Sequence, residues 1–426
     1  MILSLKIKNF LSFKDEATFS FEATKDKHLE EYQVVEVAPG IRITRIGIVF
    51  GANASGKSNL IYAFETLQKF WFKTTNSKDT DTGAIPFLLD DKTSVEPSEF
   101  TLTFYIGSKK FVYRLKMTDT IVFNEMLDYY STIRPATVFQ RIYKNNISEI
   151  RFNPKLKLNS AALNEISVKC LANMSVFAAY NQVNVHLEEM DNVLDWMKTK
   201  IMQTIEPNTR LNEYAKKQIV ADENAKNYIL DLLNQADYNI NNIDILFKEE
   251  PLQEDAIINI LKSGKISEKE KERIEKERTM KVSEITFSHK VIKENGSTGL
   301  YNLPGSLQSH GTMRTMGLAS VINKIIERDA FIAIDEVESS LHPKLVEFLL
   351  VSFLEKSSSA QMLLTTHNDS LLEAEDILRA DNIWFTRKQK NGATELYPLS
   401  DFKGLSRISS LQKAYRYGKF GAVPNI

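Results

Sequence analysis

Apolar and polar residues alternate along the first fifty positions of the chain. Leu3, Leu5 and Ile7 would share one face of a strand, with the polar residues between them on the other. A β-branched run at Ile43–Phe50 predicts a second, more buried strand. From residue 58 to residue 72 the apolar positions recur at helical spacing. We therefore expect a strand that leads through a glycine-rich turn into a helix.

The middle of the chain changes pattern twice. Two alternating segments, Glu99–Tyr105 and Lys110–Leu115, flank a short glycine-containing turn and predict a β-hairpin. The polar, proline-containing residues 74–97 predict loops. From about residue 155 to 282 the pattern of apolar and polar residues predicts helices, and residues 283–293 again resemble a strand.

The run Lys265–Lys281 is dominated by charged residues. A solvated or partly disordered helix is the interpretation that such a run favours. The alternative is a coiled-coil-like projection that docks a partner, but it would need more apolar positions than the run contains.

In the last third of the chain, short apolar segments are separated by a helical one. Phe331–Ile334, Gln361–Thr366 and Asn382–Phe385 resemble strands, and Pro343–Leu354 resembles a helix. Strands alternating with helices predict a parallel sheet and an α/β fold.

Composition narrows the class of protein. With 43% hydrophobic and 26% charged residues the chain can bury a large core. Its 54 basic and 55 acidic residues nearly cancel, so contact with nucleic acid would need a local patch. A single cysteine, Cys170, excludes an intrachain disulfide and a cysteine zinc cluster. We recognise no secretory signal and no apolar run long enough to span a bilayer, and expect a cytoplasmic protein without a membrane partner.

The glycine-rich turn has the composition of a phosphate-binding loop. It reads Gly51-Ala52-Asn53-Ala54-Ser55-Gly56-Lys57-Ser58. Glycines let the backbone N–H groups approach phosphate oxygens, and the following helix directs its positive dipole end at the anion. Lys57 would reach the β- and γ-phosphates of ATP, and the Ser58 hydroxyl would ligate Mg²⁺. The residues expected to contact the nucleotide here are Asn53, Ala54, Ser55, Gly56, Lys57, Ser58 and Asn59.

Two carboxylates follow the predicted strand Phe331–Ile334. Asp335 would be delivered to the sheet edge beside the phosphate loop, where it can hold Mg²⁺. Glu336 would then polarise the attacking water as a general base. A third acid, Glu338, makes this edge unusually negative. The same residues are compatible with a helix capped at Ser340.

Two further elements lie at helix or strand ends. His367 follows the strand Gln361–Thr366, where it could contact the γ-phosphate or the attacking water. Ser309, Gly311 and Thr312 form a turn that opens a helix, and such a helix start is a weak anion site by itself.

In this order the four elements resemble the ATPase heads of the ABC type. The loop at residues 51–58 is similar to their Walker A motif, and Asp335-Glu336 to Walker B with its catalytic glutamate. The turn at residues 309–312 resembles their signature loop, Ser339-Ser340-Leu341 their D-loop and His367 their switch histidine. The resemblance implies a mixed-sheet ATP-binding lobe with an inserted helical lobe. It predicts one lobe from residues 1–150 and 325–426, and the helical lobe from 151–324.

The N-terminal segment Leu5–Phe13 narrows the resemblance to RecF, SMC-like and OLD-type ATPases. Leu396–Phe402 and Tyr417–Pro424 are similar to a bacterial group of OLD-like ATPases without a fused nuclease, found in phage-defence systems of the abortive-infection and PARIS types. In such heads the signature loop of one subunit faces the γ-phosphate held by the other, which implies a homodimer. The resemblance does not place the Mg²⁺-linked glutamine, for which Gln140 and Gln182 are candidates. Phe13 and the Asn9–Lys14 turn are candidates for adenine stacking.

Two functions from different classes compete. The resemblance favours an ATP-gated dimeric sensor that regulates a separate effector, a nuclease or toxin, with no nuclease domain in the same chain. The alternative is a RecF- or SMC-like DNA-repair ATPase. Its candidate basic residues, such as Arg314, Lys344 and Arg379, are scattered, and direct contact with nucleic acid stays open. A transporter subunit is disfavoured by the divergent signature loop.

Overall fold

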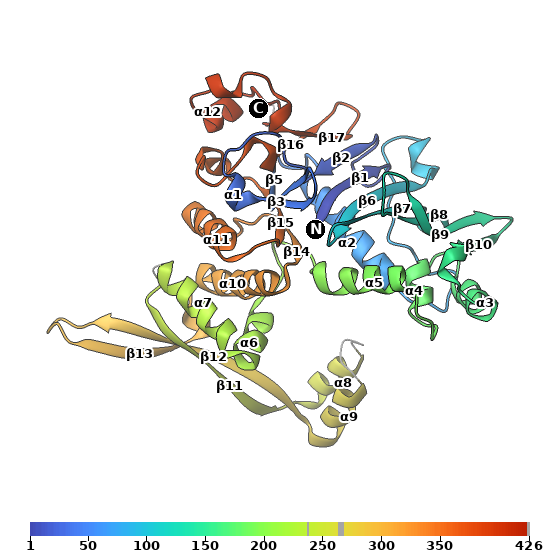
Figure 1. Cartoon of the computed structure of the whole chain (residues 1–426). Helices are drawn as coiled ribbons and strands as arrows, with labels where there is room; N and C mark the ends of the chain where they lie inside the picture. Colours follow the sequence, from blue (N-terminus) through green and yellow to red (C-terminus); the bar gives the residue numbers. More distant parts are fainter. Residues whose placement is uncertain (237, 263–267, 424–426) are drawn as a thin grey trace. The chain divides into compact units, whose positions relative to one another are not determined.

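The computed structural model describes residues 1–236, 238–262 and 268–423 (Figure 1). The chain forms two compact units, the first of Met1–Thr209 and Lys324–Ile426 and the second of Arg210–Asn323. The lobe boundaries expected from the sequence stay a prediction. Pro424 of the C-terminal motif and residues 265–267 of the charged run lie outside the described residues.

A five-stranded sheet in the first unit carries the strands that the sequence predicts around the phosphate loop. Its order is β14 (Phe331–Ile334), β15 (Gln361–Thr366), β5 (Ile46–Gly51), β16 (Ile383–Lys388) and β17 (Thr394–Pro398). The first four strands are parallel and β17 is antiparallel. Every residue of β5 and β15 is buried, which is typical of a sheet covered on both faces. The predicted parallel sheet and α/β fold are confirmed.

The outer edge of β14 is paired by residues 201–205. The Met202 amide donates to Phe331 O at 2.8 Å, and the Ile205 amide to Ala333 O at 2.9 Å. The Asp335 amide returns a bond to Ile205 O at 2.8 Å. This short parallel segment satisfies backbone groups that an edge strand would otherwise leave open.

A second sheet in the same unit is antiparallel. Its order is β10 (Ile147–Phe152), β9 (Ala136–Lys144), β8 (Val122–Tyr130), β7 (Lys109–Met117), β6 (Ser98–Ile106), β1 (Ile2–Lys8) and β2 (Ala17–Ser20). The β6–β7 pair confirms the predicted hairpin. Strands β8 and β9 of this sheet carry a fully buried ion pair: Glu125 and Arg141 lie 3.6 Å apart.

The remaining elements of the first unit are one hairpin and several helices. The hairpin is β3 (Val34–Ala38) with β4 (Ile41–Thr44). The helices are α1 (Glu30–Gln33), α2 (Lys57–Phe72), α3 (Ser160–Lys169), α4 (Val176–Tyr180), α5 (Glu188–Lys200), α11 (Pro343–Lys356) and α12 (Leu411–Arg416). α2 and α11 confirm two predicted helices. The cap of α11 is His342, not Ser340, because the His342 ring accepts the Lys344 amide while Ser340 lies in the preceding turn.

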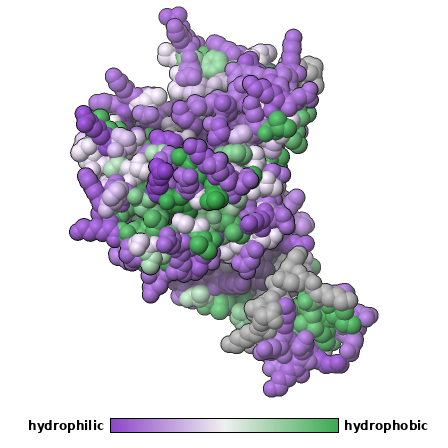
Figure 2. Space-filling view, turned by 90° about the vertical axis from the view of Figure 1, so that its right-hand side faces the viewer, coloured by the Kyte–Doolittle hydropathy of each residue, from purple (hydrophilic) through white to green (hydrophobic). Residues whose placement is uncertain are grey.

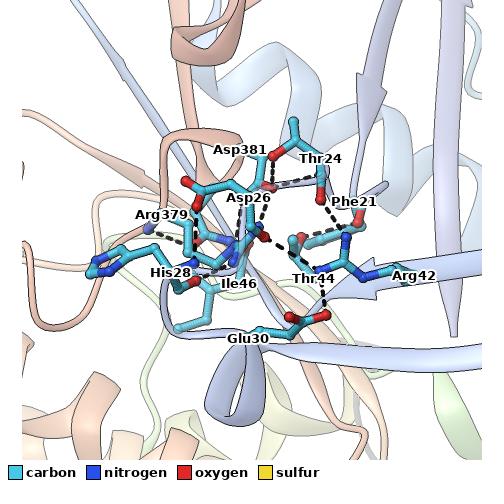
Figure 3. Close-up of polar contacts among 11 residues, drawn as sticks. Phe21, Thr24, Asp26, His28, Glu30, Arg42, Thr44, Ile46, Arg379 and Asp381 are labelled. Carbon is cyan, nitrogen blue, oxygen red and sulfur yellow. Dashed lines mark hydrogen bonds and ion pairs between the residues drawn. The ribbon is translucent and has the colours of Figure 1, made fainter. Parts of the chain in front are cut away.

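A buried polar cluster joins the N-terminal segment to the approach of β16 (Figure 3). Arg379 pairs with Asp381 at 2.7 Å and donates to the backbone carbonyls of Asp26 and His28. Asp381 also accepts from the amide and hydroxyl of Thr24, both at 2.8 Å. Arg379 is 1% exposed. It is therefore not available to contact DNA, as one of the three candidate basic residues of the alternative function.

The second unit is built on a three-stranded antiparallel sheet. Its order is β11 (Ile240–Pro251), β12 (Thr279–Ile292) and β13 (Thr298–Pro304). The helices are α6 (Asn212–Ala221), α7 (Glu223–Gln235), α8 (Glu254–Lys262), α9 (Glu268–Glu277) and α10 (His310–Arg328), the last of which continues into the first unit. The expected helical texture was wrong at β11. The segment is a strand because its backbone pairs with β12, about forty residues later in the chain. The local spacing of apolar residues cannot reveal such a distant partner.

Polar side chains cover much of the face drawn in Figure 2, with apolar groups between them. Over the residues that the structure describes, no helix joins enough length to enough apolar character to cross a bilayer.

Candidate functional site

The glycine-rich turn between β5 and α2 has a backbone that most side chains would obstruct. Ala54 and Gly56 adopt left-handed conformations, with φ of 58° and 104°. A Cβ on Gly56 would come within 2.1 Å of Thr394 Oγ1 and 2.7 Å of Ser12 Oγ. No side chain of the described residues caps the start of α2. Its first N–H groups are thus open to an anionic ligand, as phosphate binding requires.

A pocket of about 570 Å³ lies over this turn. It brings together most of the residues that the sequence singles out. These are Asn53, Ala54, Ser55, Gly56, Lys57, Ser58, Asn59, Glu336 and His367.

Lys57 lines the pocket but is largely buried, with 4% of the residue exposed. Its ammonium donates to Gly51 O at 2.9 Å and Ala52 O at 3.0 Å, and lies 3.2 Å from His367 Nδ1. Burial lowers the pKa of Lys57 to about 8, although the charges of Asp335, Glu336 and Glu338 act in the opposite direction. Burial makes the charged form of Lys57 less favourable than it is in water, and a triphosphate beside the ammonium would offset that cost.

The contacts of His367 define its tautomer. A protonated lysine can only donate, so Nδ1 of His367 must accept from Lys57. Nε2 then carries the hydrogen and donates to Glu336 Oε1 at 3.1 Å. Lys57, His367 and Glu336 thus form one hydrogen-bonded chain from the phosphate loop to the proposed base.

Asp335 lies behind this chain, 5% exposed, and is not among the residues that line the pocket. Its carboxylate accepts the hydroxyl of Thr365, whose oxygen in turn accepts the Glu336 amide at 2.8 Å. Glu336 itself has a left-handed φ of 46°. Such a conformation costs on the order of 1–3 kcal/mol and persists where surrounding contacts enforce it. Thr365 supplies one of these contacts, a role that sequence analysis missed although the residue stands two positions before His367.

The oxygen atoms near the loop suit a magnesium ion. A serine hydroxyl and a carboxylate, from Ser58 and Asp335, are the hard donors that Mg²⁺ prefers. Glu338 accepts the His367 amide through Oε1, whereas its buried Oε2 has no hydrogen-bond partner among the described residues. Within the described ranges no three His, Cys, Asp or Glu side chains gather into a metal site. Nucleotide phosphates and water would supply the further ligands of such an ion.

Ser309, Gly311 and Thr312 belong to the second compact unit. Ser309 Oγ accepts the Thr312 amide at 3.0 Å, which confirms the predicted turn at the start of α10. The contact of this turn with a nucleotide stays a prediction.

The candidate residues for adenine stacking and for the Mg²⁺-linked glutamine are not among the residues that line the pocket, apart from part of the Asn9–Lys14 turn. Phe13 is fully buried in the core and cannot stack on a base. The turn that contains it contributes Leu11 and Ser12 to the pocket instead. Neither Gln140 nor Gln182 is among the lining residues.

Residues that the sequence did not suggest complete the pocket. The loop Ile85–Leu89 lines it, although it was expected only to connect strands. Ser12, Thr386 and Thr394 hold the phosphate loop: Thr386 contacts Ser55 Oγ at 2.6 Å, and Thr394 donates to Ser55 O at 2.8 Å. These residues lie far from the loop in sequence, and no local pattern marks them.

Comparison with known proteins gives a family and a set of distant structures. The family model described as "AAA domain, putative AbiEii toxin, Type IV TA system" matches residues 47–373. A search of curated proteins found no match.

Solved SMC heads are similar over nearly the whole chain, at low identity. The SMC head domain from Thermotoga maritima is 14% identical, with 93% of this chain and 98% of that chain covered and a TM-score of 0.44. An SmcHead bound to the C-winged helix domain of ScpA is 14% identical, with coverages of 97% and 99% and a TM-score of 0.42. A Smc head with an extended coiled coil, bound to the C-terminal domain of ScpA from Pyrococcus furiosus, is 13% identical, with both coverages 98% and a TM-score of 0.36.

The family match includes the phosphate loop, the Asp335-Glu336 pair and His367. The chain therefore belongs to this family of P-loop ATPases.

Proposed function

We propose that the chain hydrolyses ATP at the Lys57–His367–Glu336 site and acts as an ATP-gated dimeric regulator of a separate effector in bacterial anti-phage defence. The observation that carries the proposal is the hydrogen-bonded chain from the phosphate loop to Glu336. It links the group that would hold the γ-phosphate to the group that would activate water.

The hydrolytic step assigns a task to each residue. The oxygen of a water molecule attacks the γ-phosphorus while its proton passes to Glu336, and the bond from phosphorus to the β–γ bridging oxygen breaks. ADP and inorganic phosphate leave. His367 Nε2–H already binds one oxygen of Glu336, so the other oxygen would face the water.

Lys57 and the metal would stabilise charge on the phosphates. The ammonium lies at the loop and would neutralise the β- and γ-phosphate oxygens. When bound, Mg²⁺ between Ser58 and Asp335 would supply further charge neutralisation.

The dimer is supported by the resemblance to ABC-type heads. The Ser309 turn presents the start of α10, a helix of 19 residues, as an anion site. In the resembling heads this turn closes on the nucleotide of the opposite subunit. ATP would then join two chains, and hydrolysis would release them.

The regulatory role is supported by the description of the family, which refers to a toxin in a type IV TA system. Membership of the OLD-like phage-defence group, a separate nuclease or toxin as effector, and the absence of a nuclease in this chain belong to the same proposal. Asp79 and Asp81, the acidic pair in the 74–97 loop, are both exposed, and Asp81 pairs with Lys73 at 3.0 Å.

The substitution Glu336→Gln tests the proposal. It keeps the shape of the side chain but removes the base, so ATP hydrolysis should fall about 10²–10⁴-fold while ATP binding is retained. The variant should also accumulate an ATP-dependent dimer, measured by light scattering. Glu355→Gln, an exposed acid on α11, is the matched control and should behave as wild type. Hydrolysis by Glu336→Gln at the wild-type rate would refute the assignment of the base, and a monomer in the presence of ATP would refute the gating.

A further inference from the structure

The pocket over the phosphate loop extends onto an aliphatic surface. Besides the polar loop, its lining includes the aliphatic residues Leu11, Ile85, Leu88 and Leu89, and one further charged residue, Lys388. Leu88 and Leu89 are 65% and 68% exposed. Two neighbouring leucines in water forgo the free energy that burial would yield, so a ligand in this pocket that covered them would be stabilised.

This surface is adjacent to the loop but separate from it. Ser12 contacts the loop, since its Oγ accepts from Asn59 Nδ2 at 2.6 Å. Its neighbour Leu11 donates its amide to Ile85 O at 2.8 Å. The turn at residues 11–12 thus places the phosphate loop on one side and the aliphatic segment on the other.

The aliphatic segment is fixed before any ligand binds. The Phe87 amide donates to Asn9 Oδ1 at 3.0 Å, and the Phe87 ring is 1% exposed. Asn9 Nδ2 donates to Thr93 O and Glu96 O, both at 2.8 Å. Lys14 pairs with Asp90 at 2.7 Å. A wall held in this way loses little conformational entropy on binding.

A close approach between Gly392 and Leu89 fixes the position of Leu89 at the pocket. A Cβ on Gly392 would come within 2.5 Å of Leu89 Cδ1, so the glycine lets Leu89 pack directly against the backbone after β16. Leu89 therefore has a defined position at the pocket although most of its surface is in water.

We propose that Leu11, Leu88 and Leu89 form a wall that binds the nucleoside of a triphosphate seated on the phosphate loop, and that it accepts adenosine and guanosine alike. The inference rests on the proposed nucleotide site. The occupant follows from chemistry: a nucleoside is the apolar-faced group covalently attached to the phosphates that the loop would hold. Aliphatic contacts engage the flat face that every base possesses and do not read its edge.

The test compares ATP with inorganic tripolyphosphate, which has the phosphates but no nucleoside. Leu88→Ser and Leu89→Ser should each weaken ATP by about three- to tenfold, which is part of the transfer free energy of a leucine. Tripolyphosphate affinity, measured by calorimetry with Mg²⁺, should not change. GTP should bind wild type within about tenfold of ATP and weaken in parallel. Val95→Ser is the control, because Val95 is 79% exposed on the same loop and does not line this pocket.

Three outcomes would overturn the wall. ATP affinity could be unchanged in both leucine variants, tripolyphosphate could weaken as much as ATP, or wild type could prefer one purine by more than a hundredfold. These failures differ from failure of the proposed function, since the assay reads binding alone. If wild type hydrolyses ATP and Glu336→Gln does not, the proposed function is retained even when these binding data refute the leucine wall.

Discussion

Two buried cations of the first unit, Lys57 at the start of α2 and Arg141 in β9, lie in different surroundings. Arg141 is fully buried and donates to Met174 O, Leu171 O, Ala172 O and the Ser148 hydroxyl, besides pairing with Glu125. Glu125 accepts from the hydroxyls of Tyr113 and Ser175 and from the Val176 amide. Lys57 has two carbonyl acceptors and one histidine nitrogen, and its neighbour Glu338 retains an oxygen without a partner among the described residues.

The difference separates a structural cation from a functional one. Lys57 lines the pocket over the phosphate loop and has a lowered pKa, so it would gain when an anion arrives, whereas Arg141 is fully buried beside its own carboxylate. Burial alone therefore does not identify a site. Burial at a pocket, together with a lowered pKa, does.

The largest effect is expected from Arg141→Met. It leaves Glu125 buried without its counter-charge and removes four further hydrogen bonds, which should cost about 3–5 kcal/mol in the free energy of unfolding. Chemical denaturation would measure it. The double variant E125Q/R141M should recover part of the loss, and the ATP affinity of the folded protein should not change. A loss of ATP affinity at full stability would erase the distinction between the two cations.

The pH dependence of Lys57 is the next largest effect. If the charged Lys57 holds the phosphates as proposed, its lowered pKa of about 8 sets the pH dependence of ATP affinity. Affinity should be constant well below pH 8 and fall by up to tenfold per pH unit above it. The terminal phosphate loses its last proton near pH ~6 and adds no slope there. Calorimetric titrations between pH 7 and 10 would measure the fall.

The same pKa predicts the stability of the ligand-free protein. An exposed lysine has a pKa near ~10.4, so between about pH 8 and 10.4 the unfolded chain binds more protons than the folded one. The free energy of unfolding should therefore rise with pH across this window, as far as Lys57 contributes. Lys57→Met should abolish that contribution, and an identical pH profile in wild type and variant would contradict it.

The smallest effect concerns the loop that carries His367. Arg416 of α12 donates to Asp369 through Nε at 2.6 Å and Nη2 at 2.9 Å, and Gln412 adds a bond at 3.0 Å. Half-exposed pairs of this kind contribute about 0.2–1 kcal/mol. Arg416→Ala should lower kcat two- to fivefold by loosening the loop, with KM for ATP unchanged in steady-state assays. Arg407→Ala, an exposed arginine nearby in sequence, should leave both constants unaltered.

The sequence predicted the elements that local chemistry encodes. Gly51 to Ser58, Asp335, Glu336 and His367 were recognisable because each follows a strand and has a side chain whose chemistry suits phosphate or water. The strands and helices around them were correct for the same reason: their apolar spacing is local.

Features built from distant residues could not be predicted in this way. Three features depend on which segments the fold brings together. They are the bridge that Thr365 forms between Asp335 and Glu336, the aliphatic wall of Leu11, Leu88 and Leu89, and the Glu125–Arg141 pair. β11 was missed because its partner strand lies beyond two helices. Arg379 was considered as a surface cation, and only its contacts with Asp381 and the segment at residues 24–28 show why it is buried.

The paired edge of β14 has a mechanical consequence. Residues 201–205, bonded along that edge, lead directly into the second unit at Arg210. The other connection, α10, returns from the second unit and ends at Arg328, just before β14 begins. Both covalent tethers of the second unit therefore converge on a single strand. Under the proposed function, a displacement of the second unit would be transmitted to the backbone directly before Asp335 and Glu336.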